Sequence, residues 1–469
     1  MSDARTRQEH DLLGVKDVPI DAYYGVQTAR ALDNFEISGV ELRLYPDLII
    51  ALAMVKQAAA RANFACGQFS REVLDGIDAA CTEIIGGSLH DQFQLDVFQG
   101  GAGTSTNMNA NEVIANRALE LMGHQKGEYS HCDPHDHVNC SQSTNDAYPT
   151  ALHVGMALGN RRLAAAMLEL VEAFNAKGRE FSEILKMGRT QLQDAVPMTL
   201  GQEFMAFGET LKGEVRTLQA MEQVLCETNM GATAIGTGLN APAGYAAKCT
   251  EHLAAITGMP IHLAPDLIEA TQDTQAFVLY SSCMKSLAIK LSKVCNDLRL
   301  LASGPRCGLR EINLPAKQPG SSIMPGKVNP VIPEVVNQVC FRVIGSDLTV
   351  SMAAEGGQLQ LNVFEPVIAA CIFEAQTMFI NAARTLRVHC VEGITANPDI
   401  CRHYVDYSIG TVTALNPVIG YERSTELATE AMKSGRGILE LIREKKILSD
   451  AEIAKVLDPA AMTGQGRPA

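Results

Sequence analysis

The segment with the densest set of chemically active side chains is residues 320–330, which reads Gly-Ser-Ser-Ile-Met-Pro-Gly-Lys-Val-Asn-Pro. Its glycines and prolines predict a loop rather than a helix or a strand. The loop carries two adjacent hydroxyls, Ser321 and Ser322, a cation at Lys327 and an amide at Asn329. Because such a loop gains little from packing, we expect it to close over a small anion and to place a base beside that anion.

Three further segments are polar and interrupted by glycine or amide side chains. They are residues 99–107 (QGGAGTSTN), 142–146 (QSTND) and 188–194 (GRTQLQD). They offer hydrogen-bond donors with few carboxylates, which suits a small dianion. We expect Lys327 near one carboxylate of that ligand, and Thr104, Ser143 and Thr144 near another. The competing interpretation is that each segment only caps a helix or forms a turn, where Ser, Thr, Asn and Gly are favoured anyway.

Two nucleotide-binding patterns fail on their details. The stretch from Gly320 to Lys327 resembles a phosphate-binding P-loop, but it has one residue too many between its glycines, and Val328 stands where Ser or Thr is needed. Residues 236–241 fit the pattern G-x-G-x-x-A, yet no βαβ unit is predicted around them. We interpret residues 231–240 as a tight connection between long helices.

The composition indicates a globular chain of more than one domain, with 469 residues of which 46% are hydrophobic and 20% charged. The net charge of −14 argues against nucleic acid or an anionic membrane surface as a partner. No apolar run approaches the roughly 18 residues of a membrane span. The polar N-terminus lacks the apolar stretch of a signal peptide, so we expect a cytoplasmic protein.

The 13 cysteines are odd in number and include no C-x-x-C pair, so we expect reduced, mostly buried thiols. One cluster of possible metal ligands comprises His131, Cys132, His135, His137 and Cys140. A zinc site there is an alternative, but the spacing matches no established zinc pattern. We therefore expect no metal site and interpret the cluster as a polar loop with incidental imidazoles.

The middle of the chain is predicted to be helical. Within residues 160–178, apolar side chains recur at helical spacing, at Leu163, Met167, Leu170, Val171 and Phe174. Similar stretches cover residues 197–228, 266–302, 331–352 and 360–391. Residues 369–382 are apolar on nearly every side, as in the middle of a bundle shared between subunits. We expect a mainly helical domain at 1–145, a long-helix bundle at 146–393 and a small helical domain at 394–469.

The loop at 320–330 resembles the signature of the aspartase/fumarase superfamily, whose members reversibly eliminate a group from a succinyl skeleton. Further blocks resemble that superfamily, in the same order and over nearly the whole chain: DAYYGVQT, QGGAGTSTNMNANE, HVNCSQSTNDAYPT, MGRTQLQDAVPMTLGQEF, GATAIGTGLN and SGPRCGLREI. The resemblance implies a mostly α, three-domain fold. Its long central helices would form the core of a homotetramer, with each site built from three chains.

Within the superfamily, the resemblance points to the aspartase branch. Thr144 stands where class II fumarases usually have a second serine, and Gln191 stands where fumarases and some aspartases carry histidine. Residues 123–129 also look aspartase-like, and residues 133–136 depart from the second anion site of fumarases. The implied reaction is the deamination of L-aspartate to fumarate and ammonium. A class II fumarase and a non-catalytic helical scaffold are the alternatives.

The resemblance also implies roles for the site residues. Ser321 would be the general base, acting as an alkoxide that removes the C3 proton. The substrate contacts would be Thr104, Ser143, Thr144 and Ser322 for the β-carboxylate, Lys327, Asn329 and Thr190 for the α-carboxylate, and Asn145 for the amino group. Gln191 would bind substrate without transferring a proton. No cofactor is required, because the reaction has no redox step; the resemblance to some aspartases implies activation by Mg²⁺.

Overall fold

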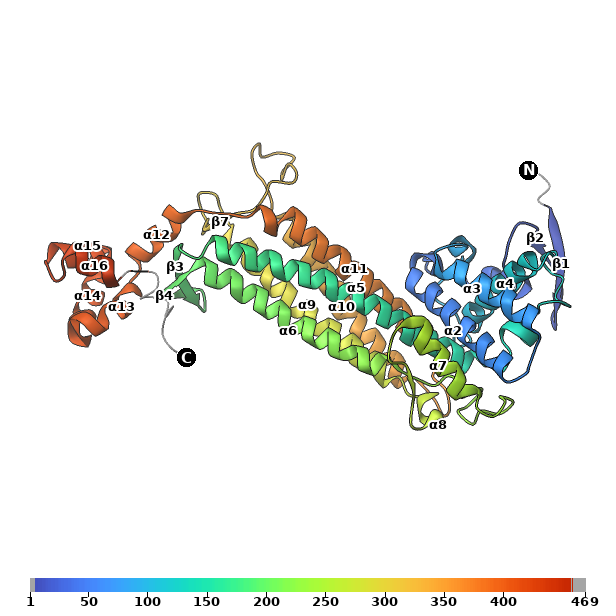
Figure 1. Cartoon of the computed structure of the whole chain (residues 1–469). Coiled ribbons are helices and arrows are strands. Elements are labelled where there is room, and N and C mark those ends of the chain that lie inside the picture. Colours follow the sequence, from blue (N-terminus) through green and yellow to red (C-terminus); the bar gives the residue numbers. More distant parts are fainter. Residues whose placement is uncertain (1–4, 457, 459–469) are drawn as a thin grey trace. The chain divides into compact units, whose positions relative to one another are not determined.

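The computed structural model describes residues 5–456 and 458, and it is mainly helical (Figure 1). The α-helices are α1 (Val26–Asn34), α2 (Pro46–Ala65), α3 (Arg71–Ile85), α4 (Thr104–Leu121), α5 (Thr144–Glu180), α6 (Leu200–Leu225), α7 (Tyr245–Thr257), α8 (Leu267–Ala270), α9 (Gln275–Leu301), α10 (Val331–Glu355), α11 (Glu365–His389), α12 (Pro398–Tyr407), α13 (Thr411–Ile419), α14 (Tyr421–Ser434), α15 (Ile438–Glu444) and α16 (Asp450–Val456). The outermost residues of the first and last predicted domains, 1–4, 457 and 459–469, lie outside the described residues.

The strands of the described residues form four two-stranded sheets. Three are antiparallel: β1 (Thr6–Asp11) with β2 (Gly14–Pro19), β3 (Leu185–Thr190) with β4 (Gln193–Thr199), and β7 (Ile312–Asn313) with β8 (Thr395–Ala396). The fourth pairs β5 (Glu227–Thr228) with β6 (His262–Leu263) in parallel. The end of the β3–β4 hairpin carries two of the predicted site residues, Thr190 and Gln191.

The helical pattern predicted for residues 160–178 is confirmed within α5. Its five apolar positions are at most 4% exposed, whereas Glu169 and Glu172 are exposed. The single helix predicted for 266–302 is wrong, because α8 ends at Ala270 and α9 begins at Gln275. The carboxylate of Asp273 accepts the backbone N–H of Gln275 and so favours the start of a new helix.

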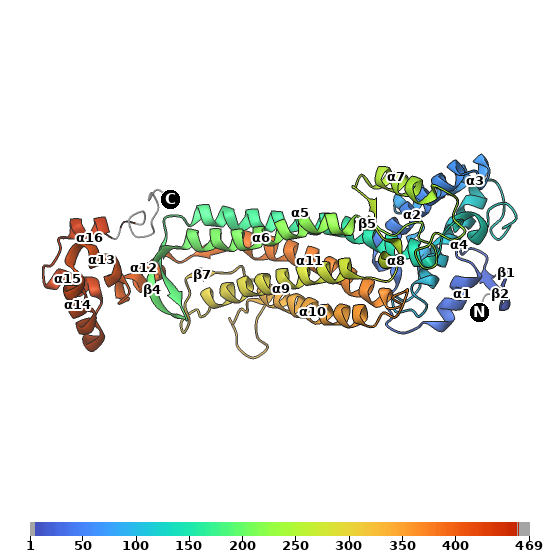
Figure 2. The same ribbon diagram turned by 90° about the horizontal axis from the view of Figure 1, so that it is seen from below.

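The described chain divides into two compact units, each built from three segments. Unit 1 comprises residues up to 164, 216–286 and 341–379; unit 2 comprises 165–215, 287–340 and 380 onward. Segments of the five long helices α5, α6, α9, α10 and α11 run side by side in each unit (Figure 2). The three-domain boundaries stay a prediction.

Hydrogen bonds of buried amides fix the helix packing inside each unit. In unit 1, the amide nitrogen of Gln376 on α11 donates to the Met156 carbonyl on α5 and to the Tyr280 hydroxyl on α9, both at 2.8 Å. In unit 2, the Asn337 amide on α10 donates to the Ser292 hydroxyl on α9 at 2.8 Å. Such bonds set the register of helices whose contacts are otherwise apolar.

Two segments are long and apolar enough to cross a membrane by length and composition, contrary to the expectation from the sequence. They are α2 and the stretch Glu365–Gly393, whose most apolar windows are 78% and 67% buried in the protein. Helix α2 packs against α3, α4 and α7. Burial of this extent is typical of core helices, so the two segments give only weak support for a membrane span.

Candidate active site

The ten predicted site residues all lie at exposed or half-buried positions, and they fall into two groups. Thr104, Ser143, Thr144 and Asn145 belong to unit 1, and Thr190, Gln191, Ser321, Ser322, Lys327 and Asn329 belong to unit 2. In unit 1 the structure connects residues from distant parts of the sequence at two helix ends. In unit 2 the predicted residues lie on two separate segments, the β3–β4 hairpin and the loop 320–330.

The unit 1 group sits at two helix N-termini. Thr104 is the first residue of α4, and Thr144 is the first residue of α5. Asn107, one turn into α4, donates from its amide to the Thr144 hydroxyl at 3.3 Å and so connects the two helix ends. The free backbone N–H groups and the dipole of a helix N-terminus favour a bound anion. Two such ends beside uncharged donors suit a carboxylate.

Asp146 fastens the start of α5 to the segment that follows Asn229. Its side chain is fully buried and accepts backbone N–H groups from Ser143 at 2.9 Å, Gly231 at 3.1 Å and Thr233 at 2.9 Å. Burial raises the pKa of this carboxyl to about 6. In addition, the Asn145 amide donates to the Ala234 carbonyl at 2.7 Å. Residues 231–240 are therefore more than a connection between helices, because they hold two residues of the QSTND segment.

Lys56 is a second buried charge that the sequence analysis missed. It lies on α2, is 0% exposed, and donates from Nζ to the side-chain oxygens of Asn107 at 2.7 Å, Gln142 at 2.9 Å and Asn139 at 3.1 Å. Burial lowers the pKa of this amine to about 7. Its charge in the middle of α2, among apolar residues and well away from Asp47 and Arg61, was the available signal, because lysine is almost never fully buried unless it is paired.

In unit 2, Thr190 and Gln191 lie at the turn of the β3–β4 hairpin. Thr190 is the last residue of β3, and Gln191 and Leu192 form the two-residue turn. Both turn residues have left-handed backbone conformations, with φ of 55° and 62°. Side chains at such a turn point outward, and all three residues are exposed. The hairpin was not predicted as a strand pair, because LKMGRT and QDAVPMT lack a clean apolar alternation.

The segment 320–330 is the irregular loop that its glycines and prolines predicted. Gly320 donates its N–H to the Lys327 carbonyl at 2.8 Å, and the Asn329 amide donates to the Gly320 carbonyl at 2.7 Å. A side chain at Gly320 would lie 2.5 Å from that Lys327 carbonyl oxygen, so only glycine fits. Lys327 and Ser322 are exposed on the loop.

The hydroxyl of Ser321 accepts two backbone N–H groups of its own loop. Its Oγ lies 2.9 Å from the nitrogen of Met324 and 3.2 Å from that of Ile323. Donors aimed at an oxygen in this way stabilise negative charge on it. The arrangement is therefore chemically suited to a serine alkoxide, and its catalytic role stays a prediction.

The side chains of the cluster at 131–140 make contacts of other kinds. Among the residues that the structure describes, no group of three or more His, Cys, Asp or Glu side chains is arranged to hold a metal ion. Cys132 is fully buried, and burial raises the pKa of its thiol to about 12. His137 accepts the Asp133 N–H through Nδ1 at 2.8 Å, and His135 contacts the Gln27 amide at 2.7 Å. These contacts support the interpretation as a polar loop.

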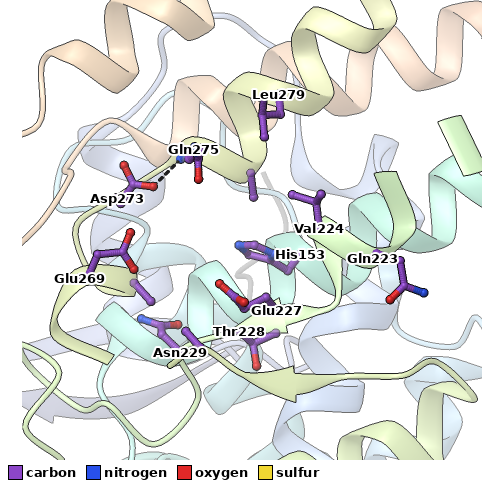
Figure 3. Close-up of a pocket in the computed structure, with 13 residues that line it drawn as sticks. His153, Gln223, Val224, Glu227, Thr228, Asn229, Glu269, Asp273, Gln275 and Leu279 are labelled. Carbon is purple, nitrogen blue, oxygen red and sulfur yellow. Dashed lines mark hydrogen bonds between the residues drawn. The ribbon is translucent and has the colours of Figure 1, made fainter. Parts of the chain in front are cut away.

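A cavity of about 370 Å³ in unit 1 contains none of the ten predicted residues (Figure 3). Glu227, Glu269 and Asp273 line it together with His153. His153 Nδ1 contacts the Leu225 carbonyl at 3.2 Å, and burial lowers the pKa of the imidazole to about 4, so the ring is neutral. Three carboxylates without a cation among them repel a dianion, so we do not assign this cavity as the predicted anion site.

Comparisons with known proteins agree with the fold. The chain matches the family model described as Lyase over residues 14–345, and the model described as Fumarase C C-terminus over residues 412–464. It is 60% identical to an aspartate ammonia-lyase of Pseudomonas aeruginosa, over 98% of this chain and 97% of that protein. It is 54% identical to an aspartate ammonia-lyase of Escherichia coli, over 95% and 94% of the two chains.

Two solved structures are similar over nearly their whole length. The first is a fumarate lyase:delta crystallin from Brucella melitensis bound to cobalt, with a TM-score of 0.94, 53% identity and coverage of 98% of this chain and 99% of that one. The second is a recombinant class II fumarase from Schistosoma mansoni, with a TM-score of 0.91, 36% identity and coverage of 99% and 100%.

Proposed function

This chain belongs to the aspartase/fumarase superfamily of lyases, and we propose that it catalyses the reversible deamination of L-aspartate to fumarate and ammonia. The proposal is supported by identities of 54% and 60% to proteins named aspartate ammonia-lyase, against 36% to the class II fumarase. Thr144 and Gln191 support the same choice, since both differ from the residues usual in fumarases. The fumarase and scaffold alternatives are not favoured.

The environment of Ser321 is the observation that carries the proposed chemistry. The proton on C3 of aspartate is a very weak acid, so its removal needs a strong base. A serine hydroxyl serves only as an alkoxide, and the N–H groups of Ile323 and Met324 stabilise that form relative to the neutral hydroxyl. The cation of Lys327 on the same loop favours it further.

Loss of the C3 proton leaves an aci-carboxylate with two negative charges on the former β-carboxylate. Donors that strengthen their bonds as this charge develops lower the barrier. We assign that role to Thr104, Ser143, Thr144 and Ser322, of which Thr104 and Thr144 stand at helix N-termini. Lys327, Asn329 and Thr190 bind the α-carboxylate, whose charge stays constant through the reaction.

The amino group leaves in the second half of the reaction. Asn145 contacts this group, and Gln191 hydrogen-bonds the substrate without transferring a proton, because an amide does not titrate. The amine is protonated in L-aspartate at neutral pH and departs as ammonia without an acid from the protein. The elimination is redox-neutral and needs no electron carrier. A divalent cation such as Mg²⁺ enters this proposal only as an activator.

The assembly that we propose is a homotetramer in the cytoplasm. An apolar stripe on α10 supports it: Phe341, Leu348 and Met352 are 61%, 65% and 67% exposed and lie on one helix face. Large apolar side chains exposed in a row mark an association surface. We expect this stripe to pack against a second copy of the chain.

The proposal is tested by assaying ammonia and fumarate release from L-aspartate, L-malate and 3-methylaspartate. We expect release of ammonia from L-aspartate only, and loss of most of that rate in Ser321→Ala with the oligomer intact. Removing one essential group of a catalytic unit costs about 1,000-fold or more in kcat. Hydration of fumarate without deamination of aspartate would instead identify a fumarase, and an inactive wild type would identify a scaffold.

A further inference from the structure

A cluster of four charged side chains lies at the base of the β3–β4 hairpin in unit 2. Glu311, whose side chain is 0% exposed, approaches Lys186 Nζ at 2.7 Å and Arg189 Nη1 at 2.6 Å. The first contact is an ion pair whose angles fall outside hydrogen-bonding geometry, and the second is a hydrogen bond. Lys186 also contacts Glu203 at 2.5 Å. Two cations and two carboxylates leave the cluster electrically balanced, as burial requires.

The two cations both belong to strand β3, which leads directly into the turn. The register of the hairpin shifts between Met187 and Arg189, where Gly188 faces an extra residue of β4. A bulge of this kind increases the twist of the strands and redirects side chains. A Cβ atom at Gly188 would lie 2.8 Å from the Val196 carbonyl oxygen, so the close approach requires glycine.

The tip of the hairpin is strained, and the rest of the structure must hold it. A two-residue turn with positive φ at both positions normally uses Asn and Gly, whereas this one uses Gln191 and Leu192. Strained backbone persists where its surroundings fix it, and it concentrates at functional sites. The Arg189 guanidinium, which precedes the tip by two residues, also lies 5.2 Å from the centre of the Tyr404 ring.

The backbone of Glu311 is fixed by hydrogen bonds at both its N–H and its carbonyl group. Its N–H donates to the Leu301 carbonyl at 2.9 Å, and its carbonyl accepts the N–H of Asn397 at 2.9 Å. It also precedes β7, from which the chain enters the loop that contains Ser321. A fixed carboxylate is a firm anchor for the two cations of β3.

We propose that Glu311 is a positioning residue, which acts through Lys186 and Arg189 to hold the strained hairpin tip so that Thr190 and Gln191 meet the substrate. This inference rests on the proposed function and adds residues that its mechanism does not use. Thr190 contacts the α-carboxylate, whose charge does not change during the reaction. Loss of such a contact weakens the binding of the substrate and of the transition state equally, which raises KM and leaves kcat unchanged.

The test compares four variants in the aspartate assay. In Glu311→Gln and in Arg189→Gln, we expect KM for L-aspartate to rise about tenfold or more with kcat nearly constant, as for lost uniform binding. Glu311→Asp keeps the charge and is expected to restore part of the affinity. Hydrogen exchange of the amides in residues 185–199 should quicken in the first two variants. If Glu311→Gln fails to fold, the less buried Arg189→Gln decides the question.

Glu214→Gln is the matched control. Glu214 is also buried in unit 2 and is also paired with a lysine, Lys290, but it lies on α6 away from the hairpin. We expect the KM of the Glu214→Gln variant for L-aspartate to equal that of the wild type. The proposal is overturned if KM stays constant in Glu311→Gln and Arg189→Gln, or if the control raises KM equally. A wild type without aspartate activity would overturn the proposed function instead. Faster hydrogen exchange of the hairpin in Glu311→Gln would still show that Glu311 holds the hairpin.

Discussion

Asp146 offers the sharpest test of how the unit 1 group is held. Its substitution by asparagine keeps the shape of the side chain but places an amide nitrogen where one carboxylate oxygen was. The oxygen Oδ2 accepts the N–H groups of both Gly231 and Thr233, and Oδ1 accepts that of Ser143, so the new NH₂ group would face one or two donors in either orientation of the amide. Either the segment 231–234 or Ser143, which precedes α5, would then lose its acceptor, and the anchor between the two would weaken.

Two opposing effects set the change in stability. Leaving one or two buried N–H donors without an acceptor costs about 1–3 kcal/mol each, or about 1–6 kcal/mol in all. Removing the buried charge offsets part of this loss. Burial raises the pKa of Asp146 from 3.8 to about 6, so above pH 6 the ionised carboxylate destabilises the folded state by about 3 kcal/mol. An uncharged asparagine avoids that cost. The free energy of unfolding should therefore fall by no more than about 3 kcal/mol.

The loss of activity should be much larger than this stability change suggests. A displacement of reacting groups by about 1 Å costs roughly 100-fold in rate, so we expect kcat/KM for L-aspartate to fall by about that factor while the oligomer persists. The measurement is steady-state kinetics together with chemical denaturation. Glu112→Gln is the control, because Glu112 is also buried, accepts three backbone N–H groups and has a pKa raised to about 7 by burial.

The reasoning is refuted if Asp146→Asn retains activity within a few-fold of wild type. It is equally refuted if Glu112→Gln, which holds α1 rather than the α5 terminus, loses as much activity at the same cost in stability.

Two further predictions concern Gln191 and Glu365. Gln191→His should retain measurable deamination, because the position is proposed to bind rather than to transfer a proton; loss of activity in this variant, with activity kept in Gln191→Ala, would contradict the assignment. Glu365 is 5% exposed, and burial raises its carboxyl pKa from 4.5 to about 8, so the folded state holds a proton that the unfolded state releases between those values. The free energy of unfolding of the wild type should therefore fall as pH rises from about 5 to 9. In Glu365→Gln it should fall by up to about 5 kcal/mol less over that range. Thermal unfolding at several pH values would measure both changes.

The sequence predicted the elements whose information is local. The stripe from Leu163 to Phe174 identified a face of α5 because apolar spacing in a helix depends on residues within two turns. The loop around Ser321 was identified because glycine and proline act on their own backbone. The break between α8 and α9 was missed, since an apolar pattern continued across Asp273 while its carboxylate capped a new helix.

The groups that hold the site were missed because their partners are distant in the sequence. Lys56 reaches Asn107, Asn139 and Gln142, which lie on other elements, and nothing near Lys56 in the sequence indicates them. The hairpin at 185–199 was missed for a related reason: its strands are fixed by Glu311, more than a hundred residues away, rather than by their own alternation.

These cases share one physical cause. The exposed motifs carry hydroxyls, amides and one cation that must keep precise positions while remaining open to a ligand, so they cannot be fixed by burying their own side chains. Buried charged side chains hold these motifs instead: Asp146 and Lys56 in unit 1, and Glu311 in unit 2. Their charge-assisted hydrogen bonds are stronger and more directional than apolar contacts. Each buried charge costs desolvation, which is evident in the shifted pKa values of Asp146 and Lys56. A protein without a site to position would gain stability by replacing such charges with apolar residues. Their presence beside the segments 99–107, 142–146 and 188–194 therefore argues that these segments are functional.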